Sequence, residues 1–565
     1  MEVIKYFKYV LLVTIAITFP VLACFFLVFR GLLHFYLKLK HGEDFYGLMD
    51  GYDTVWEVHE TSRGQITILG TFDFDEEKNG DVYDAFVRQI HQPELRRSCR
   101  KAAMRRRHLL GYNYYIEMDP YDGLVQKMPP YEDEEDVRRM LSACSNQPIG
   151  PQDDKMLEFL VGTKPIRFAQ NGRFEYPIIM KMHHSLGDGI ALMNFCITGL
   201  GRDPAAFLKK TEEDFRKMFK IKKNDQGNDA ARPEDAANEA DANAEEASTT
   251  PKKGTMQLGK LLRKVMTSKF YHPLFGKPDA NLLHGKTLTG RKNLVWSRDM
   301  GRDYVRAVKN IKSRFDGVSF NNVLFAALAA SFSEYYQKHD PDNVPDYIVN
   351  GIVLLPFIPK FEDMVTIVDG KVEALDLSNK FVVAFLKLPL ISNGSVEANL
   401  LDLVDRVKRE IISLSQSLDI ALTIFFMKYF AYIMPLPLVK FIMSYFDSTI
   451  SASNLPGHGR LEMFHGGHIN DLYFWIPNIK KIGIGISMFT YDNRLRIGLI
   501  ADEALIPEVD NVQELVDNVF KYLDVMDKLS QTLVNNNNEC TIPNNNINLD
   551  GLVCSEKMQK IQINS

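Results

Sequence analysis

The spacing of apolar residues divides much of the chain into strand-like and helix-like segments. Runs rich in β-branched and aromatic residues predict four strands, at 65–74, 176–182, 347–357 and 380–390. Apolar residues recur three and four positions apart over 321–339 and 511–529, and an unbroken apolar run fills 190–200, so these three segments are predicted helices. The mixture predicts an α/β or α+β architecture with large sheets.

The N-terminal segment is apolar enough to enter a membrane. Val10–Phe29 carries no charged residue, and a helix of about twenty residues crosses a hydrocarbon core of roughly 30 Å. The run leads into Arg30 and further aliphatic residues rather than into a small-residue cleavage site, which favours a retained transmembrane anchor over a signal peptide. Pro20 leaves two arrangements open, a kinked span and a re-entrant hairpin.

Ile420–Tyr445 is a second long apolar segment, interrupted by Lys428, Pro435, Pro437 and Lys440. Two interpretations remain open for it, an interfacial or re-entrant membrane element and a buried core segment.

Two polar segments lack the apolar residues that a folded core requires. Residues 224–254 contain no aromatic or large aliphatic residue and are rich in Ala, Asp, Glu and Asn, and residues 534–565 are rich in Asn. Such stretches cannot offset the entropy lost on ordering, so we expect a disordered acidic insert and a disordered tail.

Length and composition narrow the class of protein. A chain of 565 residues exceeds the usual size of a single core, which predicts two lobes. The net charge of -5 gives no reason to expect a nucleic-acid partner. Six cysteines without CxxC spacing favour a reducing compartment over a disulfide framework.

The short stretch "HHSLGDG" at 183–189 is the strongest candidate for chemistry. The predicted strand at 176–182 delivers the chain into His183 and His184, and the predicted helix follows, so rigid elements hold this turn on both sides. A metal site is not expected, because no third ligand accompanies the two histidines. The pattern alone leaves two hypotheses open, a general base and a pair of buried histidines beside a glycine turn.

These seven residues match HHxxxDG, and three further regions match in the same order. They are "GVSFNNVLFAALAASFSEY" at 317–335, "LSNKFVVAFLKLPL" at 377–390, and the two C-terminal segments 451–469 and 483–502. Together they resemble the wax ester synthase/diacylglycerol acyltransferase (WS/DGAT) branch of the HHxxxDG CoA-dependent acyltransferase superfamily, from about residue 50 to about residue 530. The resemblance implies an α/β fold of two chloramphenicol-acetyltransferase-like lobes with a tunnel between them.

The resemblance also assigns roles to individual residues. His184 would be the general base, His183 and Gly189 would support the geometry of the turn, and Asp188 would hold it through an ion pair. Asn321 is a candidate oxyanion donor or tunnel residue, with a helix N-cap as the alternative. Asn322 stands where the family has Asp, which questions any charge-dependent role at that position.

The implied activity is transfer of a long-chain fatty acyl group from acyl-CoA to a fatty alcohol, with diacylglycerol as the alternative acceptor. No cofactor beyond the acyl-CoA donor is expected. A noncatalytic lipid-binding protein of the same fold stays open, whereas condensation of amino acids would require carrier modules that the sequence lacks. We expect a membrane location, in the endoplasmic reticulum, with the catalytic body in the cytosol. The sequence does not indicate whether the protein is a monomer or an oligomer.

The predicted domains are a membrane anchor at 1–45, lobes at 50–290 and 291–533, and the tail at 534–565. Two other groups of residues are candidate sites. The basic segment Arg96–Arg107 is predicted to be a solvated face, with binding of CoA phosphates or anionic headgroups as the alternative. His465 and His468 are predicted loop or tunnel-wall residues rather than metal ligands.

Overall fold

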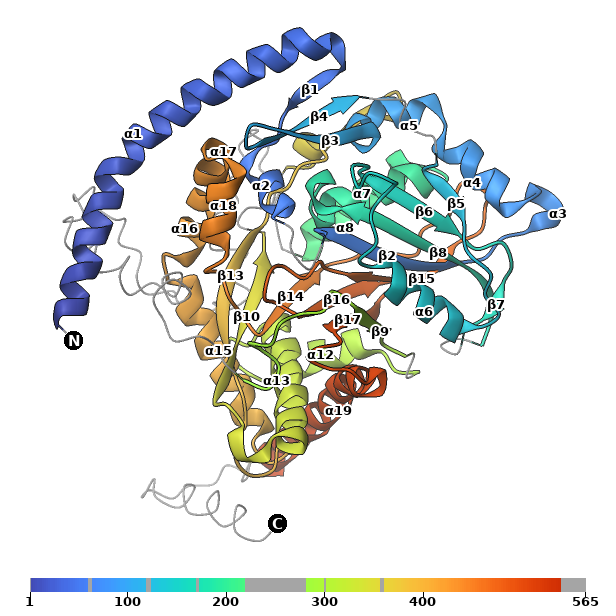
Figure 1. Cartoon of the computed structure of the whole chain (residues 1–565). Coiled ribbons are helices and arrows are strands. Elements are labelled where there is room, and N and C mark those ends of the chain that lie inside the picture. Colours follow the sequence, from blue (N-terminus) through green and yellow to red (C-terminus); the bar gives the residue numbers. More distant parts are fainter. Residues whose placement is uncertain are drawn as a thin grey trace, which may run out of the picture.

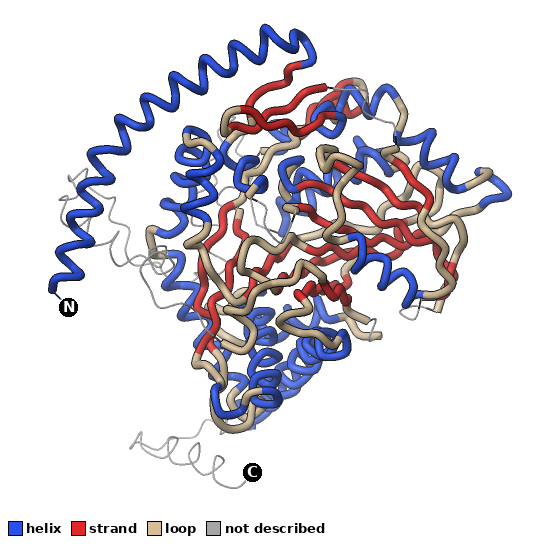
Figure 2. The backbone as a smooth tube through the Cα atoms, viewed as in Figure 1, coloured by secondary structure: helices blue, strands red, loops and turns tan. Residues whose placement is uncertain are grey.

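The computed structural model describes residues 2–58, 63–117, 123–168, 172–218, 281–298, 301–355 and 360–539. Two mixed sheets occupy the centre of the molecule, and helices cover their outer faces (Figures 1 and 2). The predicted acidic insert and residues 540–565 of the predicted tail lie outside the described residues.

The sheet of the first lobe has the strand order β15-β2-β8-β6-β5, with β7 pairing to β8. Its strands are β2 Gln65–Phe72, β5 Val125–Lys127, β6 Leu157–Val161, β7 Ile166–Arg167, β8 Phe174–His183 and β15 Ile469–Trp475. Its helices are α3 Glu76–Asn79, α4 Val82–Ile90, α5 Pro93–Ser98, α6 Glu134–Cys144, α7 Gly189–Leu200 and α8 Pro204–Met218. The central strands β2 and β8 are antiparallel and almost wholly buried.

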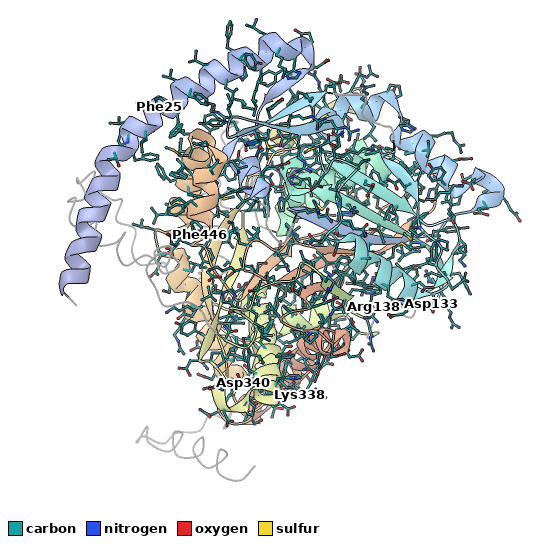
Figure 3. The ribbon with its side chains drawn as sticks, viewed as in Figure 1. Phe25, Asp133, Arg138, Lys338, Asp340 and Phe446 are labelled. Carbon is teal, nitrogen blue, oxygen red and sulfur yellow. The ribbon has the colours of Figure 1, made fainter. Side chains whose placement is uncertain are left out.

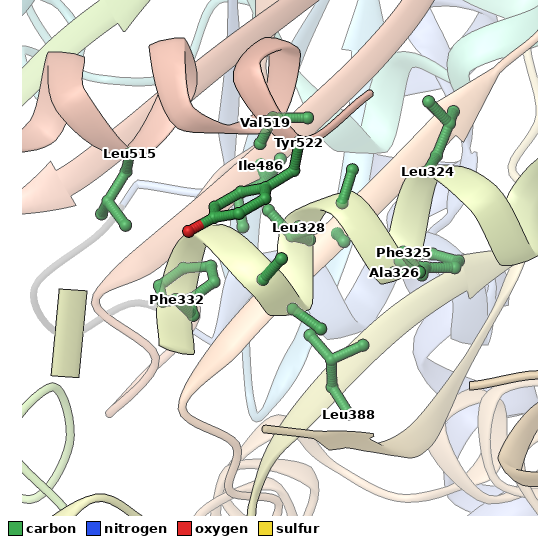
Figure 4. Packing of buried hydrophobic residues seen from close by; sticks show 14 of the residues in the cluster. Leu324, Phe325, Ala326, Leu328, Phe332, Leu388, Ile486, Leu515, Val519 and Tyr522 are labelled. Carbon is green, nitrogen blue, oxygen red and sulfur yellow. The ribbon is translucent and has the colours of Figure 1, made fainter. Parts of the chain in front are cut away.

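The sheet of the second lobe has the order β13-β10-β14-β16-β17-β9. Its strands are β9 Lys292–Trp296, β10 Tyr347–Leu354, β13 Val382–Pro389, β14 Ile450–Leu455, β16 Ile484–Tyr491 and β17 Arg494–Asp502. Its main helices are α12 Tyr304–Ser313, α13 Phe320–His339, α15 Leu400–Ser415 and α19 Val509–Glu539. Figure 4 shows α13 packed through Leu324 and Leu328 between this sheet and Tyr522 of α19.

A third layer lies outside the lobes on one side (Figure 1). It contains the long helix α1 Glu2–His41, the small sheet β1-β4-β3 and a group of short helices. The bounds are β1 Phe45–Leu48, β3 Met104–Leu109, β4 Tyr112–Glu117, α2 Gly51–Thr54, α16 Asp419–Phe425, a π-helical turn Phe426–Phe430, α17 Ala431–Ile433 and α18 Leu436–Met443. The helix α14 Phe361–Met364 precedes a separate hairpin of β11 Val365–Val368 and β12 Lys371–Leu375.

The predicted secondary structure is confirmed at each segment. The four predicted strands are β2, β8, β10 and β13, and the three predicted helices are α7, α13 and α19. Periodicity succeeded here because each segment buries most of its apolar residues in one of the two large cores.

Three details differ from the sequence expectation. β15 lies in the segment predicted for the second lobe, yet it pairs with β2 in the sheet of the first. α19 continues to Glu539, so the first residues of the predicted disordered tail are helical; the growing helix adds one backbone hydrogen bond per residue, which offsets the modest helix propensity of Asn. α1 is continuous through Pro20, which excludes the re-entrant hairpin at that position.

Ile420–Tyr445 forms neither a single span nor a fully buried core segment. It folds into α16, the π-helical turn, α17 and α18. The helical segment 419–433 is bent by 49° relative to the preceding helix at 400–415. One face of this segment packs inward through Phe426, Met427 and Val439, whereas Phe425 and Phe441 are exposed. The amphipathic arrangement agrees with the interfacial interpretation of this segment.

Candidate active site

The HHxxxDG stretch forms the turn between β8 and α7. β8 ends at His183, a 3₁₀ turn covers His184–Leu186, and α7 begins at Gly189. Both histidines are buried, but the break in the strand between them gives them different neighbours. The two imidazoles therefore lie in different surroundings.

His184 is held by Asn379, which lies just before β13. The Asn379 amide nitrogen donates to the His184 carbonyl oxygen at 2.8 Å and to Asp53 Oδ1 at 2.8 Å. Asn379 Oδ1, 3.2 Å from His184 Nδ1, is thereby left as an acceptor, so Nδ1 must carry the proton. His184 Nε2 then has a free lone pair and forms no hydrogen bond with the described residues, as a general base requires.

A buried ionic group fixes Asn379 from behind. Asp53 Oδ2 accepts from Lys101 Nζ at 2.8 Å and from the Tyr115 hydroxyl at 2.8 Å, while its other oxygen accepts from Asn379. Lys101 also donates to the Leu377 carbonyl oxygen at 2.9 Å. Because Asp53 is satisfied on both oxygens, the Asn379 amide cannot flip without breaking a charge-assisted hydrogen bond.

Aromatic rings enclose the His184 imidazole. The Trp56 ring stacks on it with centroids 3.7 Å apart and planes within 7°, and Phe381 lies 5.2 Å away. This burial lowers the pKa of His184 to about 4, against a smaller opposing effect of its hydrogen bonds. The imidazole is therefore neutral near pH 7.

Trp56 itself has an unused hydrogen-bond donor. Its indole Nε1 is buried and has no hydrogen-bond partner among the described residues. A buried donor without an acceptor costs roughly 1–3 kcal/mol, so Trp56 carries a donor that a bound oxygen atom would satisfy.

His183 faces the other way and has the opposite tautomer. The Ser185 backbone N–H donates to His183 Nδ1 at 3.3 Å, and the Ser185 hydroxyl lies 2.7 Å from the same nitrogen. His183 Nε2 lies 3.7 Å from Glu57 Oε1. These contacts agree with the supporting role predicted for His183.

Asp188 stabilises the turn, but not through the expected ion pair. Its Oδ1 accepts from the backbone N–H groups of Ile190 and Ala191, which caps α7, and its Oδ2 accepts from the Lys380 backbone N–H at 2.9 Å. No Lys or Arg side chain in the described ranges lies within ion-pair distance of Asp188. Burial raises the pKa of Asp188, and the three backbone donors oppose that rise.

Gly189 permits a close approach at the start of α7. A Cβ at this position would lie 2.3 Å from Leu455 Cδ1 at the end of β14. The missing side chain therefore makes room for a residue of the second lobe.

The second motif closes a helix end. Ser319, not Asn321, is the N-cap of α13, so the N-cap alternative for Asn321 is wrong. Asn322 completes a capping box, since its Oδ1 accepts from the Ser319 N–H at 2.6 Å. Asn321 Oδ1 accepts from Asn454 Nδ2 at 2.5 Å, and this contact engages its oxygen but leaves its amide N–H groups unassigned.

The basic segment Arg96–Arg107 is a solvated face only in its first part, where Arg96, Arg97 and Arg100 are exposed. Each cation within it lies within 4 Å of a carboxylate, and the partners are Glu94, Glu117, Asp53, Asp153, Asp154 and Glu57. Lys101 and Arg106 are buried. The residues from Lys101 onward therefore form a largely buried ion-pair network, and sequence pattern missed it because Asp53, Glu57 and Asp154 come from distant parts of the chain.

The remaining candidates lie apart from His184. His465 packs against Phe74 and accepts from the Gly467 N–H, and His468 lies near Asp73. Two cavities of about 580 and 600 Å³ lie elsewhere, one between α6 and β9 and one beside α4 and β5. No group of three or more metal-ligating side chains could hold a metal ion within the described ranges.

Sequence reasoning missed Asp53, Trp56 and Asn379. Asn379 lies within the "LSNKFVV" match at 377–383, but the sequence assigned it no role. The motif order was the available signal for it, whereas nothing in the local sequence around 53–56 distinguishes Asp53 or Trp56.

A comparison with protein families gives a match in the second lobe. Residues 377–524 match the WS/DGAT C-terminal domain family. This part of the chain is a WS/DGAT C-terminal domain. The predicted family is thereby confirmed over this part of the chain, which includes Asn379, the residue that holds His184.

Solved structures of one fold resemble most of the chain. A trichothecene 15-O-acetyltransferase from Fusarium sporotrichioides is 10% identical with a TM-score of 0.54, covering 85% of this chain and 95% of that one. The wax ester synthase/diacylglycerol acyltransferase from Marinobacter aquaeolei is 13% identical with a TM-score of 0.49, covering 86% and 100%. The predicted two-lobed CoA-dependent acyltransferase fold is confirmed. A comparison with curated protein sequences gave no match.

Proposed function

We propose that this protein is an acyl-CoA-dependent O-acyltransferase that esterifies a long-chain alcohol, with His184 as its general base. The observation that carries the proposal is the tautomer of His184. His184 Nδ1–H donates a hydrogen bond to Asn379 Oδ1. The unprotonated Nε2 has no hydrogen-bond partner among the described residues and lies beside two aromatic rings.

The reaction follows from this geometry. His184 Nε2 takes the proton of the alcohol as its oxygen attacks the thioester carbonyl carbon of acyl-CoA. The tetrahedral intermediate collapses with loss of the CoA thiolate, which takes the proton back from Nε2, and the ester is released. A positioned base of this kind contributes roughly 10²- to 10⁴-fold.

The negative oxygen of the intermediate requires a hydrogen-bond donor. We assign this role to Trp56 Nε1, the unpaired buried donor on the ring that stacks against His184. Asn321, the candidate from sequence, has its side-chain oxygen engaged by Asn454. Each preorganised donor contributes about 2.7–4 kcal/mol to such a step.

A fatty alcohol suits the surroundings of His184. A single-chain primary alcohol needs less room beside the stacked Trp56 ring than the two chains of a diacylglycerol. The apolar cluster that contains Trp56 and Phe381 also contains residues of α1, the π-helical turn, α17 and α18, so an apolar environment extends from the base to the outer helices. We propose attachment of the protein to the endoplasmic reticulum membrane through α1, with the catalytic body in the cytosol.

The test is ester formation by the full-length protein in membranes supplied with labelled palmitoyl-CoA and equal amounts of hexadecanol and diacylglycerol. His184→Ala should lower the rate by at least about 10²-fold. His465→Ala is a matched control, since burial also lowers the pKa of His465 to about 4, yet it lies apart from the turn.

Wax ester as the main product supports the alcohol as acceptor, and triacylglycerol as the main product would replace it by diacylglycerol. Equal ester formation by wild type and a folded His184→Ala variant would overturn the proposed base. No ester from the folded wild type would favour a lipid-binding protein.

A further inference from the structure

The described part of α1 has two apolar stripes on opposite faces. The inward stripe recurs with alternating steps of four and three residues and contains Phe19, Ala23, Phe26, Arg30, Leu33 and Leu37. The outward stripe contains the four residues Val21, Val28, Leu32 and Leu39, which are 64–71% exposed. Packing within the protein explains the inward stripe. The outward stripe is apolar and exposed, so contacts within the protein do not explain it.

The inward stripe fastens α1 along the body over its described length. Phe19 stacks on Phe430 of the π-helical turn at 5.8 Å. The Arg30 guanidinium lies 4.1 Å from the ring centre of Tyr432 and donates to the Met49 carbonyl oxygen at 2.6 Å. Leu37 is fully buried against the β1-β4-β3 sheet. Figure 1 shows α1 as an arc along these elements.

A helix fastened in this way cannot cross a bilayer without carrying its neighbours into the hydrocarbon. β4 of the sheet that α1 packs against ends at Glu117, which forms an ion pair with Arg100. Charged side chains in the bilayer centre are costly, whereas an amphipathic helix parallel to the surface keeps its polar neighbours in water. The docked position of residues 19–37 therefore favours a helix in the membrane surface over the predicted transmembrane anchor.

The short helices beside α1 continue the same exposed apolar surface. Phe425, Leu438 and Phe441 are exposed on α16 and α18, and Leu110 is exposed at the β3–β4 turn, which meets Pro435. Phe25 of α1 and Phe446, which follows α18, lie on this side of the molecule in Figure 3. We call the exposed apolar residues of α1, α16–α18 and this turn the lipid face.

The charges of the lipid face identify its partner. Neither Thr18–Lys40 nor Ile420–Phe446 contains an acidic residue, although the whole protein has a net charge of -5. The charged residues in these segments are Arg30, Lys38, Lys40, Lys428 and Lys440, and the first is used internally. Apolar surface bordered by Lys40, Lys428 and Lys440 is complementary to an anionic lipid leaflet, whereas Lys38 pairs with the exposed Glu43 just beyond α1.

The lipid face is also connected to the catalytic turn. The π-helical turn abuts α2 so closely that a Cβ on Gly51 would lie 1.8 Å from the Met427 carbonyl oxygen. α2 carries Asp53, which fixes Asn379 and through it His184. The apolar cluster between the two regions contains Trp56 and Phe381, the rings that enclose the base.

We propose that the lipid face docks on an anionic membrane leaflet with α1 parallel to its surface, so that the lipophilic acceptor reaches His184 from that leaflet through the apolar cluster. The second part rests on the proposed function, and the first does not. The occupant is a lipid leaflet rather than a second copy of the chain.

The orientation is tested with single environment-sensitive labels at Val21, Val28 and Leu39 of the full-length protein, bound to vesicles containing phosphatidylserine and depth-dependent quenchers. A parallel helix places all three labels at the same shallow depth. A deep label at Val28 with shallow labels at both other positions would overturn the parallel orientation, as would three labels that remain in water.

Docking and delivery are tested with Leu32→Asp and Phe441→Asp, with Phe174→Asp as the matched control, because Phe174 is 70% exposed at the start of β8 on another part of the molecule. Each lipid-face variant should lower vesicle binding about tenfold, and the control should not. Binding that stays unchanged, or concentration-dependent dimers that the variants abolish, would overturn docking on lipid.

Delivery predicts that the same variants lose about tenfold of their rate with vesicle-borne hexadecanol and keep their rate with water-soluble butanol. Equal loss with both alcohols would overturn delivery from the leaflet. Absence of ester from the wild type with either alcohol would overturn the proposed function alone, since vesicle binding and label depth do not require catalysis.

Discussion

The turn at His183–Gly189 and the start of α13 at Ser319–Asn322 are both sequence motifs at the beginning of a buried helix, yet they use their polar residues differently. At α13 the capping box consumes the Ser319 hydroxyl and the Asn322 oxygen locally. At the turn, Asp188 caps α7 and thereby leaves His184 free to be held by a residue of the other lobe. A polar residue at a helix start is available for chemistry only when another residue satisfies the helix.

The largest expected effect is the loss of activity on protonation of His184. Burial lowers its pKa to about 4, so kcat/KM should stay level from pH 7 to about pH 5 and fall by half near pH 4. The same burial affects stability. Between pH 6.5 and 4 the unfolded chain binds a proton that the folded chain excludes, so stability is complete above pH 6.5 and decreases as the pH falls. Brief assays with return to pH 7 separate the two effects, and an acid limb at pH 6.5 would contradict the buried position of the base.

Trp56→Phe tests which residue is the oxyanion donor, because it keeps a stacked ring and removes the Nε1 donor. If Trp56 stabilises the oxyanion, kcat should fall by about 10²-fold with little change in KM. Asn321→Ala, at the start of α13, should have a much smaller effect. Steady-state kinetics of both variants decide between them, and the reverse ranking would assign the donor to Asn321.

Asn379→Ala removes the acceptor that sets the His184 tautomer. We expect a fall in kcat of about tenfold to 10²-fold with the fold retained, since the base would sample the unproductive tautomer. Circular dichroism and thermal unfolding serve as the control for folding. Unchanged kcat in a folded variant would show that His184 is positioned without Asn379.

Asp188→Ala should affect stability more than chemistry. It removes two capping hydrogen bonds to α7 and the contact to the Lys380 N–H beside Asn379, which we expect to cost about 2 kcal/mol of unfolding free energy and about tenfold in rate. Denaturant unfolding measures the first effect. A loss of activity as large as that of His184→Ala, with stability unchanged, would instead indicate a direct catalytic role.

The smallest expected effect is that of Asn322→Asp, which restores the family residue at α13. The carboxylate would keep the contact to the Ser319 N–H, remove the unpaired buried Nδ2 of Asn322 and place a negative charge at a helix N-terminus. We expect stability to change by about 1 kcal/mol or less and activity to stay the same. A large gain in kcat would show that the second motif takes part in the chemistry after all.

Much of the architecture was predictable because local pattern and burial agree. The period-two and period-3.6 segments became the central strands and helices, and His184 was identified through the motif around it. Pattern failed where a residue acts across lobes. Asp53, Lys101 and Asn379 are separated by up to 326 positions in the chain, yet they form one hydrogen-bonded group.

The sequence alone determined which segments are apolar, how their side chains are spaced and that two histidines stand together at the end of a strand, since these properties depend on near neighbours in the chain. Only the tertiary structure decided which histidine nitrogen is free, that Lys101 and Arg106 of the basic segment have buried partners and that α1 is fastened along the body. Those outcomes depend on burial and on hydrogen bonds between distant segments, because a group's partners in the folded protein set its tautomer, its charge and its exposure.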